Sequence, residues 1–126
     1  MQTAPPLAGR ALDGGDFVLA EWVDENDTSA ARPIAPLHVH HADDEAWYVL
    51  EGALGFRYGD DELHAPAGSA VLVPAGVAHS FWNAAGARTR YLIVMTPRIA
   101  ALVEAVHRPC DDVPALFARF SSALVE

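Results

Sequence analysis

The sequence predicts an all-β fold, a sandwich or barrel of short strands that is followed by two short helices. From about residue 17 to residue 96, short segments rich in β-branched and aromatic residues are separated by Gly, Pro or Asp clusters about every 8 to 12 residues. After Pro97 the hydrophobic period becomes helical. With 126 residues, 52% hydrophobic and 20% charged, the chain is long and apolar enough for one core. We therefore expect a single domain over 1–126, with the barrel core at about 17–96 and the helices at about 98–124.

Turn residues divide the strand-rich part into eight segments, after a lead-in rich in Pro and Gly at 5–15. Gly59, Asp60 and Asp61 have the chemistry of a hairpin turn. Pro66 and Pro74 mark strand ends, because proline cannot donate a hydrogen bond to a sheet. The predicted strands are 17–23, 37–40, 45–51, 54–58, 62–65, 70–73, 79–83 and 90–96.

The C-terminal part carries two apolar stripes with helical spacing. The first consists of Ile99, Leu102, Val103 and Val106, and the second of Val113, Leu116, Phe117, Phe120 and Leu124. We expect two amphipathic helices that cover a sheet face or a partner subunit.

Composition excludes several classes of function. The net charge of −9 repels phosphate backbones and anionic membrane surfaces, so neither nucleic acid nor membrane is an expected partner. All eight basic side chains are arginine, and the lack of lysine excludes Schiff-base and pyridoxal chemistry. Cys110 is the sole cysteine, which excludes an internal disulfide or a cysteine-held metal cluster. No secretion signal or membrane span is evident, so we expect a soluble, cytoplasmic protein.

Three histidines and one glutamate have the pattern of a metal site. His38 and His40 alternate on a predicted strand, so their side chains point to one face with Cα atoms about 6.6 to 7 Å apart. Glu45 begins an otherwise apolar strand, and burying its carboxylate costs several kcal/mol unless a cation or hydrogen bonds compensate. His79 begins another strand after a Pro/Gly turn. Such ligands suit one divalent Fe, Mn, Ni, Co, Cu or Zn ion and leave one or two coordination positions open.

These residues belong to two longer motifs that resemble those of the cupin family in order and spacing. The motifs are His38-x-His40-x4-Glu45-x6-Gly52 and Gly68-x5-Pro74-x-Gly76-x2-His79-x3-Asn83, and they span about half of the chain. One departure is Arg32, which stands where the family often has a glycine six positions before the first histidine.

The resemblance implies a double-stranded β-helix, or jelly-roll barrel, that holds one divalent transition metal ion. It implies metal ligands at His38, His40, Glu45 and His79, turns at Gly52 and Gly76, and framing roles for Pro74 and Asn83. The family commonly dimerises through its sheets, which implies a homodimer, although a monomer fits the sequence equally well.

By strand parity, Trp47 and Val49 share a face with Glu45, and Phe81 shares a face with His79. We expect these three residues and Phe56 to line a pocket at the barrel mouth, with plain core packing as the alternative.

Other polar residues near the motifs are expected to have no part in the site. We interpret Asp43 and Asp44 as a solvated turn. We expect His41 to face solvent and His64 and His107 to be isolated. Surface positions are predicted for three arginines, Arg57, Arg88 and Arg90.

Three functions fit these residues. The first is a metal-dependent dioxygenase, similar to the quercetinase-like cupins, in which Glu45 could also act as a base on a small organic substrate with adjacent oxygen donors. The second is a redox-silent cyclase or isomerase that uses Zn or Mn. The third is a non-catalytic cupin that binds a small ligand.

Overall fold

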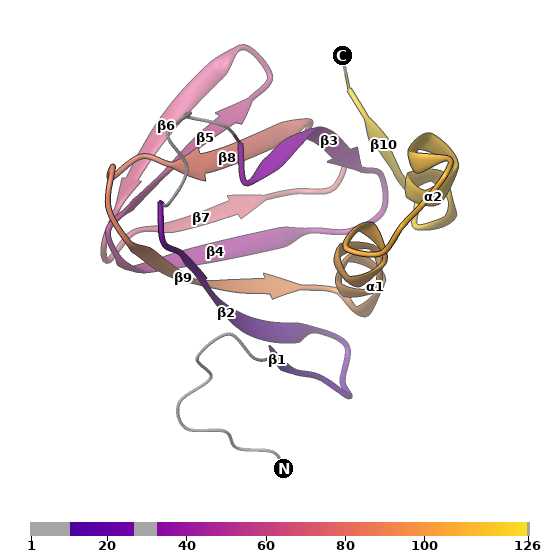
Figure 1. The fold of residues 1–126 in the computed structure, drawn as a ribbon, viewed down its shortest axis with the longest axis horizontal. Helices are drawn as coiled ribbons and strands as arrows, with labels where there is room; N and C mark the ends of the chain where they lie inside the picture. The colour runs from indigo at the N-terminus through magenta and orange to yellow at the C-terminus, as the bar shows by residue number, and fades with distance from the viewer. Residues whose placement is uncertain (1–10, 27–32, 126) are drawn as a thin grey trace.

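Two five-stranded antiparallel sheets face each other in the computed structural model, which describes residues 11–26 and 33–125 (Figure 1). In spatial order, one sheet contains β1 (Ala11–Leu12), β2 (Val18–Asp24), β9 (Thr89–Met95), β4 (Glu45–Glu51) and β7 (Ala70–Val73). The other contains β10 (Ser122–Leu124), β3 (Ala35–His40), β8 (His79–Asn83), β5 (Ala53–Tyr58) and β6 (Asp61–Pro66). The eight strands predicted from the sequence are confirmed, each with both ends within two residues of the predicted position.

The core lies between the sheets because alternate residues of each strand point inward. Trp47 from β4 packs edge-on against Phe56 from β5, with ring centroids 5.0 Å apart. Phe56 in turn stacks on Phe81 from β8 at 5.7 Å. Aromatic side chains from both sheets therefore fill the centre of the barrel.

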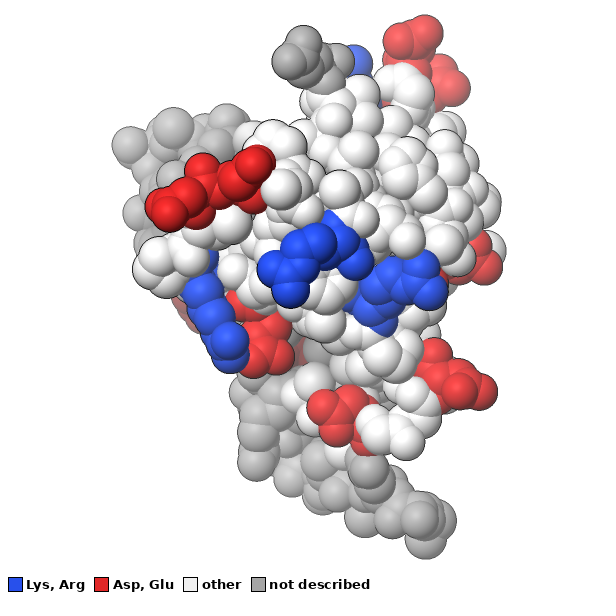
Figure 2. Space-filling view, turned by 90° about the vertical axis from the view of Figure 1, so that its right-hand side faces the viewer, with Lys and Arg blue, Asp and Glu red and all other residues white. Residues whose placement is uncertain are grey.

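Two helices, α1 (Pro97–Val106) and α2 (Val113–Arg119), lie together at one end of the sheets (Figure 1). Each begins at a capping side chain: the Thr96 hydroxyl accepts from the Ile99 amide at 3.2 Å, and the Asp112 carboxylate accepts from the Ala115 amide at 3.1 Å. On the outside of this end, acidic and basic side chains are interspersed with uncharged surface (Figure 2). Within residues 11–26 and 33–125, no helix is long and apolar enough to cross a membrane.

The sequence-based prediction was wrong for the last segment of the chain. The second helix was expected to continue to Leu124, but it ends at Arg119, and Ser121 adopts a left-handed backbone with φ of 53°. The next residues form β10, which pairs antiparallel with β3 so that Ser122 lies opposite His40. Phe120 and Leu124 continue the helical spacing of apolar residues, so the sequence pattern did not reveal that the chain reverses at Ser121. Strand β1, within the lead-in at 5–15, was also missed because it has two residues.

The turn between β4 and β5 depends on Gly52, as the motif resemblance implied. Its φ is 79°, and a Cβ there would meet the Thr89 side chain and would lie 2.8 Å from the Arg88 carbonyl oxygen. Gly76 has a similar φ of 85°, but a Cβ there would have no neighbour within 4 Å among the atoms of the described residues.

We predict that Gly52→Ala destabilises the protein more than Gly76→Ala. The Gly76 variant bears the left-handed backbone cost of about 1 to 2 kcal/mol, and the Gly52 variant adds an overpacking cost of about 1 to 3 kcal/mol. Urea unfolding of both variants measures the difference. Equal losses of unfolding free energy would contradict this account of the turn.

Candidate metal centre

The four predicted ligands meet in the interior of the barrel. His38 and His40 come from β3, His79 from β8 and Glu45 from β4, so both sheets contribute. All four side chains are buried, and one potential ligand atom from each lies within 4.8 Å of the others. His38 and His79 are direct cross-strand partners, which places their rings side by side on one face.

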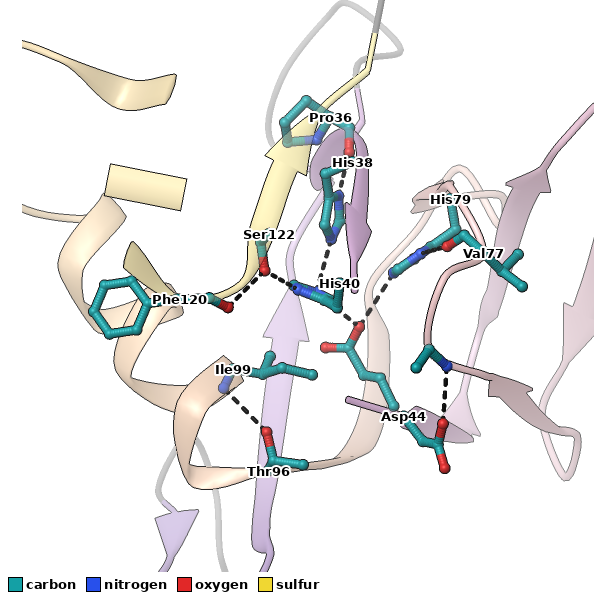
Figure 3. A network of polar contacts seen from close by, with 12 residues as sticks. Pro36, His38, His40, Asp44, Val77, His79, Thr96, Ile99, Phe120 and Ser122 are labelled. Atoms are coloured by element: carbon teal, nitrogen blue, oxygen red, sulfur yellow. Dashed lines mark hydrogen bonds and ion pairs between the residues drawn. The ribbon is translucent and has the colours of Figure 1, made fainter. Parts of the chain in front are cut away.

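Hydrogen bonds to the outer ring nitrogens orient all three imidazoles (Figure 3). The Nδ1 of His38 lies 2.6 Å from the Pro36 carbonyl oxygen, and that of His79 lies 3.0 Å from the Val77 carbonyl oxygen. A carbonyl can only accept, so both Nδ1 atoms carry the proton and both Nε2 atoms present a lone pair to the centre.

His40 is oriented by a side chain from the C-terminal strand. Its Nδ1 lies 2.7 Å from the hydroxyl of Ser122, which is 3% exposed. That hydroxyl donates to the Phe120 carbonyl oxygen at 3.0 Å, so it accepts from His40 (Figure 3). The Nε2 of His40 is therefore also a lone-pair atom.

The inward atoms approach one another too closely to be left without a cation. The Nε2 atoms of His38 and His40 are 3.2 Å apart. The Oε1 atom of Glu45 lies 3.2 Å from His79 Nε2 and 3.6 Å from His40 Nε2. Lone pairs and a carboxylate at these distances repel unless a metal ion, or protons added to the imidazoles, lies between them. The donor set and its geometry thus fit a metal ion of the predicted class.

Burial and neighbouring groups prepare these side chains to bind a cation. Burial lowers the pKa of His38 to about 4, helped by the nearby His79 and His40, so His38 is neutral at pH 7. Burial by itself would raise the pKa of Glu45. In the metal-free protein, His40 or His79 can donate a hydrogen bond to this carboxylate only when its Nε2 atom carries an added proton, and these contacts with the two imidazoles hold the pKa of Glu45 below its usual value. Neutral imidazole and ionised carboxylate are the forms that coordinate a metal.

A cavity of about 510 Å³ opens beside this cluster and includes His38, His40 and Glu45 in its wall. Most of its other lining is apolar. The aromatic members are Trp22, Phe81, Tyr91 and Phe117, and the aliphatic members include Ile34, Ile93, Met95, Leu102, Val103 and Val106. Residues of both sheets and both helices therefore enclose the space next to the four side chains.

Of the four residues expected to line the pocket, Phe81 does so. Trp47, Val49 and Phe56 do not line this cavity; they are core residues at most 2% exposed, in agreement with the alternative of plain core packing. Strand parity alone could not distinguish the mouth of the barrel from its interior. Trp47 still supports the centre, because its ring packs edge-on against that of His79 at 5.8 Å.

Two further expectations need correction. His107 was interpreted as isolated, but it lines the cavity at the C-terminal end of α1. The solvated-turn interpretation was wrong for Asp43, which is 10% exposed and forms an ion pair with Arg98 at 3.4 Å. It was incomplete for Asp44, which is exposed but accepts a hydrogen bond from the Ala75 amide at 2.8 Å.

The remaining polar residues lie where the sequence placed them. His41, His64, Arg57 and Arg88 are exposed. Arg90 is partly exposed and forms an ion pair with Glu21 at 3.4 Å. None of these residues lines the cavity.

Comparisons with known proteins agree with this geometry. The family model described as "Cupin domain" matches residues 30–95. An uncharacterized protein of Streptomyces coelicolor is 39% identical over 57 residues, which cover 45% of this chain and about half, 53%, of that protein.

Two solved structures are similar in fold. A Klebsiella pneumoniae protein with a double-stranded β-helix domain has a TM-score of 0.57 at 21% identity and is matched over 76% of this chain and 82% of its own. A Silicibacter pomeroyi sugar phosphate isomerase of the cupin superfamily has a TM-score of 0.56 at 27% identity, over 65% of this chain and 51% of its own. The expected double-stranded β-helix fold is confirmed.

We predict that Ser122→Ala weakens the affinity for Zn²⁺ by about 10- to 100-fold, because His40 loses the partner that fixes its ring and tautomer. Competition with a chromophoric chelator measures the affinity. Ser122→Thr should retain most of it, and Ser69→Ala serves as a control on a partly buried serine outside the cluster. Unchanged affinity in a folded Ser122→Ala protein would contradict the role of Ser122.

The lowered pKa of His38 also predicts a pH dependence of stability in the metal-free protein. In the unfolded chain this histidine binds a proton near its ordinary pKa of 6.5, whereas in the fold it does so near 4. Between these values the unfolded state holds more protons, so the free energy of unfolding falls as the pH is lowered from 6.5 to 4.

Urea unfolding at several pH values, after removal of metal with a chelator, measures this dependence. His38→Asn should give a shallower decline over that interval than the parent protein. Identical slopes would show that His38 does not carry the effect.

Proposed function

The chain belongs to the cupin domain family, and from this premise we propose that it is a metal-dependent dioxygenase acting on a small organic substrate with adjacent oxygen donors. The observation that carries the proposal is the position of the ligand cluster. His38, His40 and Glu45 form part of the wall of a largely apolar cavity, so a molecule bound there contacts the metal-binding residues.

The side chains have separate tasks in this proposal. The three imidazole Nε2 atoms and Glu45 would hold the ion, and the bound ion would supply open coordination positions for oxygen and substrate. Both imidazole contacts of Glu45 are made by Oε1, so Oε2 is the atom available to accept a proton from a substrate hydroxyl. The apolar walls exclude water from the reacting groups.

A second candidate is a redox-silent isomerase or cyclase that uses Zn or Mn with the same four ligands. The similarity to the Silicibacter pomeroyi sugar phosphate isomerase favours it, although this chain spans about half, 51%, of that protein. Here the ion would polarise a carbonyl, and Glu45 would move a proton.

We predict that protein loaded anaerobically with Fe(II) consumes oxygen with one member of a catechol, flavonol and 1,2-diketone panel. His79→Ala should lose both metal and oxygen consumption, because it removes a ligand at the centre of the cluster. His64→Ala, at an exposed position on β6, is the matched control and should retain both. Element analysis and an oxygen electrode provide the two measurements.

Other outcomes would redirect the assignment. Protein that is isolated with zinc alone, and that consumes no oxygen with any of these compounds, would favour the isomerase or cyclase. Unchanged ligand affinity in His79→Ala, with no turnover in the parent protein, would indicate a non-catalytic binding protein.

A further inference from the structure

The acidic side chains that line the cavity are not matched by an arginine or a lysine; the basic side chains in its described lining are the imidazoles of His38, His40 and His107. Glu45 lies beside the cavity with the other metal-binding residues, and Asp24 and Glu25 line it where β2 ends. No arginine is among the described residues that line it, and the sequence has no lysine. The negative charge of Glu25 is paired at the surface with Arg88, whose Nε atom lies 3.3 Å from Glu25 Oε1. Asp24 forms no ion pair with a described residue.

This distribution disfavours ligands that carry a negative group away from the metal. A phosphate or carboxylate placed against the apolar walls would lose its hydration without gaining an arginine or lysine partner among the described lining residues, where His107 at the end of α1 is the one imidazole outside the metal-binding cluster. The negative charge of Asp24 would add repulsion. The ion bound by His38, His40, Glu45 and His79 can compensate a negative oxygen only where the ligand coordinates it.

Tyr91 offers a polar contact to an uncharged ligand. Its side chain lines the cavity and is 4% exposed, and its hydroxyl makes no hydrogen bond with a described residue. Burial, together with the negative charges of Asp24 and Glu45, raises the pKa of Tyr91, so the hydroxyl remains a hydrogen-bond donor at neutral pH. Because the Tyr91 side chain lines the cavity, a ligand oxygen bound there can accept a hydrogen bond from this hydroxyl.

We propose, building on the metal-dependent function above, that the cavity selects uncharged, ring-bearing molecules. Such a ligand places adjacent oxygen donors on the metal, packs its ring against the aromatic side chains Trp22 and Phe81, and accepts a hydrogen bond from Tyr91. Phosphorylated and carboxylated molecules of similar size are rejected. This preference sets the chain apart from an enzyme that acts on sugar phosphates.

Two hydroxypyranones with the same metal-chelating hydroxyketone test the preference for uncharged ligands. Kojic acid carries a neutral hydroxymethyl group where comenic acid carries a carboxylate. Calorimetry on the zinc-loaded protein should show kojic acid binding at least about 10-fold more tightly, because a buried charge without a partner is costly. Comenic acid binding equally well or better, or neither compound binding, would overturn the proposal.

Single substitutions separate the roles of Asp24 and Tyr91. Asp24→Asn should raise the affinity for comenic acid by several-fold and leave the affinity for kojic acid unchanged. The control Asp61→Asn, at an exposed position on β6, should change neither affinity. Tyr91→Phe should weaken kojic acid binding by about 2- to 12-fold, the effect of one hydrogen bond, without changing the zinc affinity. Tyr58→Phe, on the exposed end of β5, is its control.

These measurements also separate this inference from the function on which it rests. If zinc does not bind at all, both the proposed function and the inference fail. If zinc binds but the charge preference is reversed, or if Tyr91→Phe has no effect, the inference alone is overturned.

Discussion

Repulsion between inward-facing lone pairs is the interaction on which the centre of this barrel depends. The outer nitrogens of His38, His40 and His79 donate to fixed oxygen acceptors, so each ring presents its lone pair to the same small volume as the Glu45 carboxylate. A core built for stability alone would avoid such an arrangement, because buried polar groups are normally paired with complementary ones. A cation at the centre replaces three unfavourable contacts with four metal–ligand bonds.

The fold brings these groups together by using both of its sheets. The face-to-face packing of the sheets lets Glu45 approach from β4 while the imidazoles approach from β3 and β8. The C-terminal segment then adds two features. Strand β10 supplies the hydroxyl that orients His40, and residues of α1 and α2 form part of the cavity wall. The part of the chain beyond the family motifs thus completes a site whose ligands lie within them.

Much of this arrangement could be predicted from local sequence patterns. Strand alternation placed His38 and His40 on one face, and the motif spacing added Glu45 and His79. Ser122 could not be found in this way, because its role depends on a left-handed residue that reverses the chain after α2 and on a pairing 82 residues distant in sequence. Tyr91 was missed for a related reason. It is one of several inward residues of β9, and its relation to the cavity depends on how the helices close the barrel.

X-ray absorption spectroscopy at the metal edge tests the central claim most directly, because it reports the ligands of a bound ion without requiring a substrate. Protein loaded with one equivalent of zinc should show three imidazole nitrogens and one carboxylate oxygen at about 2.0 to 2.2 Å. An ion with fewer than three imidazole ligands, or one surrounded mainly by water, would contradict the account. That result would mean that the lone pairs in the barrel are neutralised by protons instead.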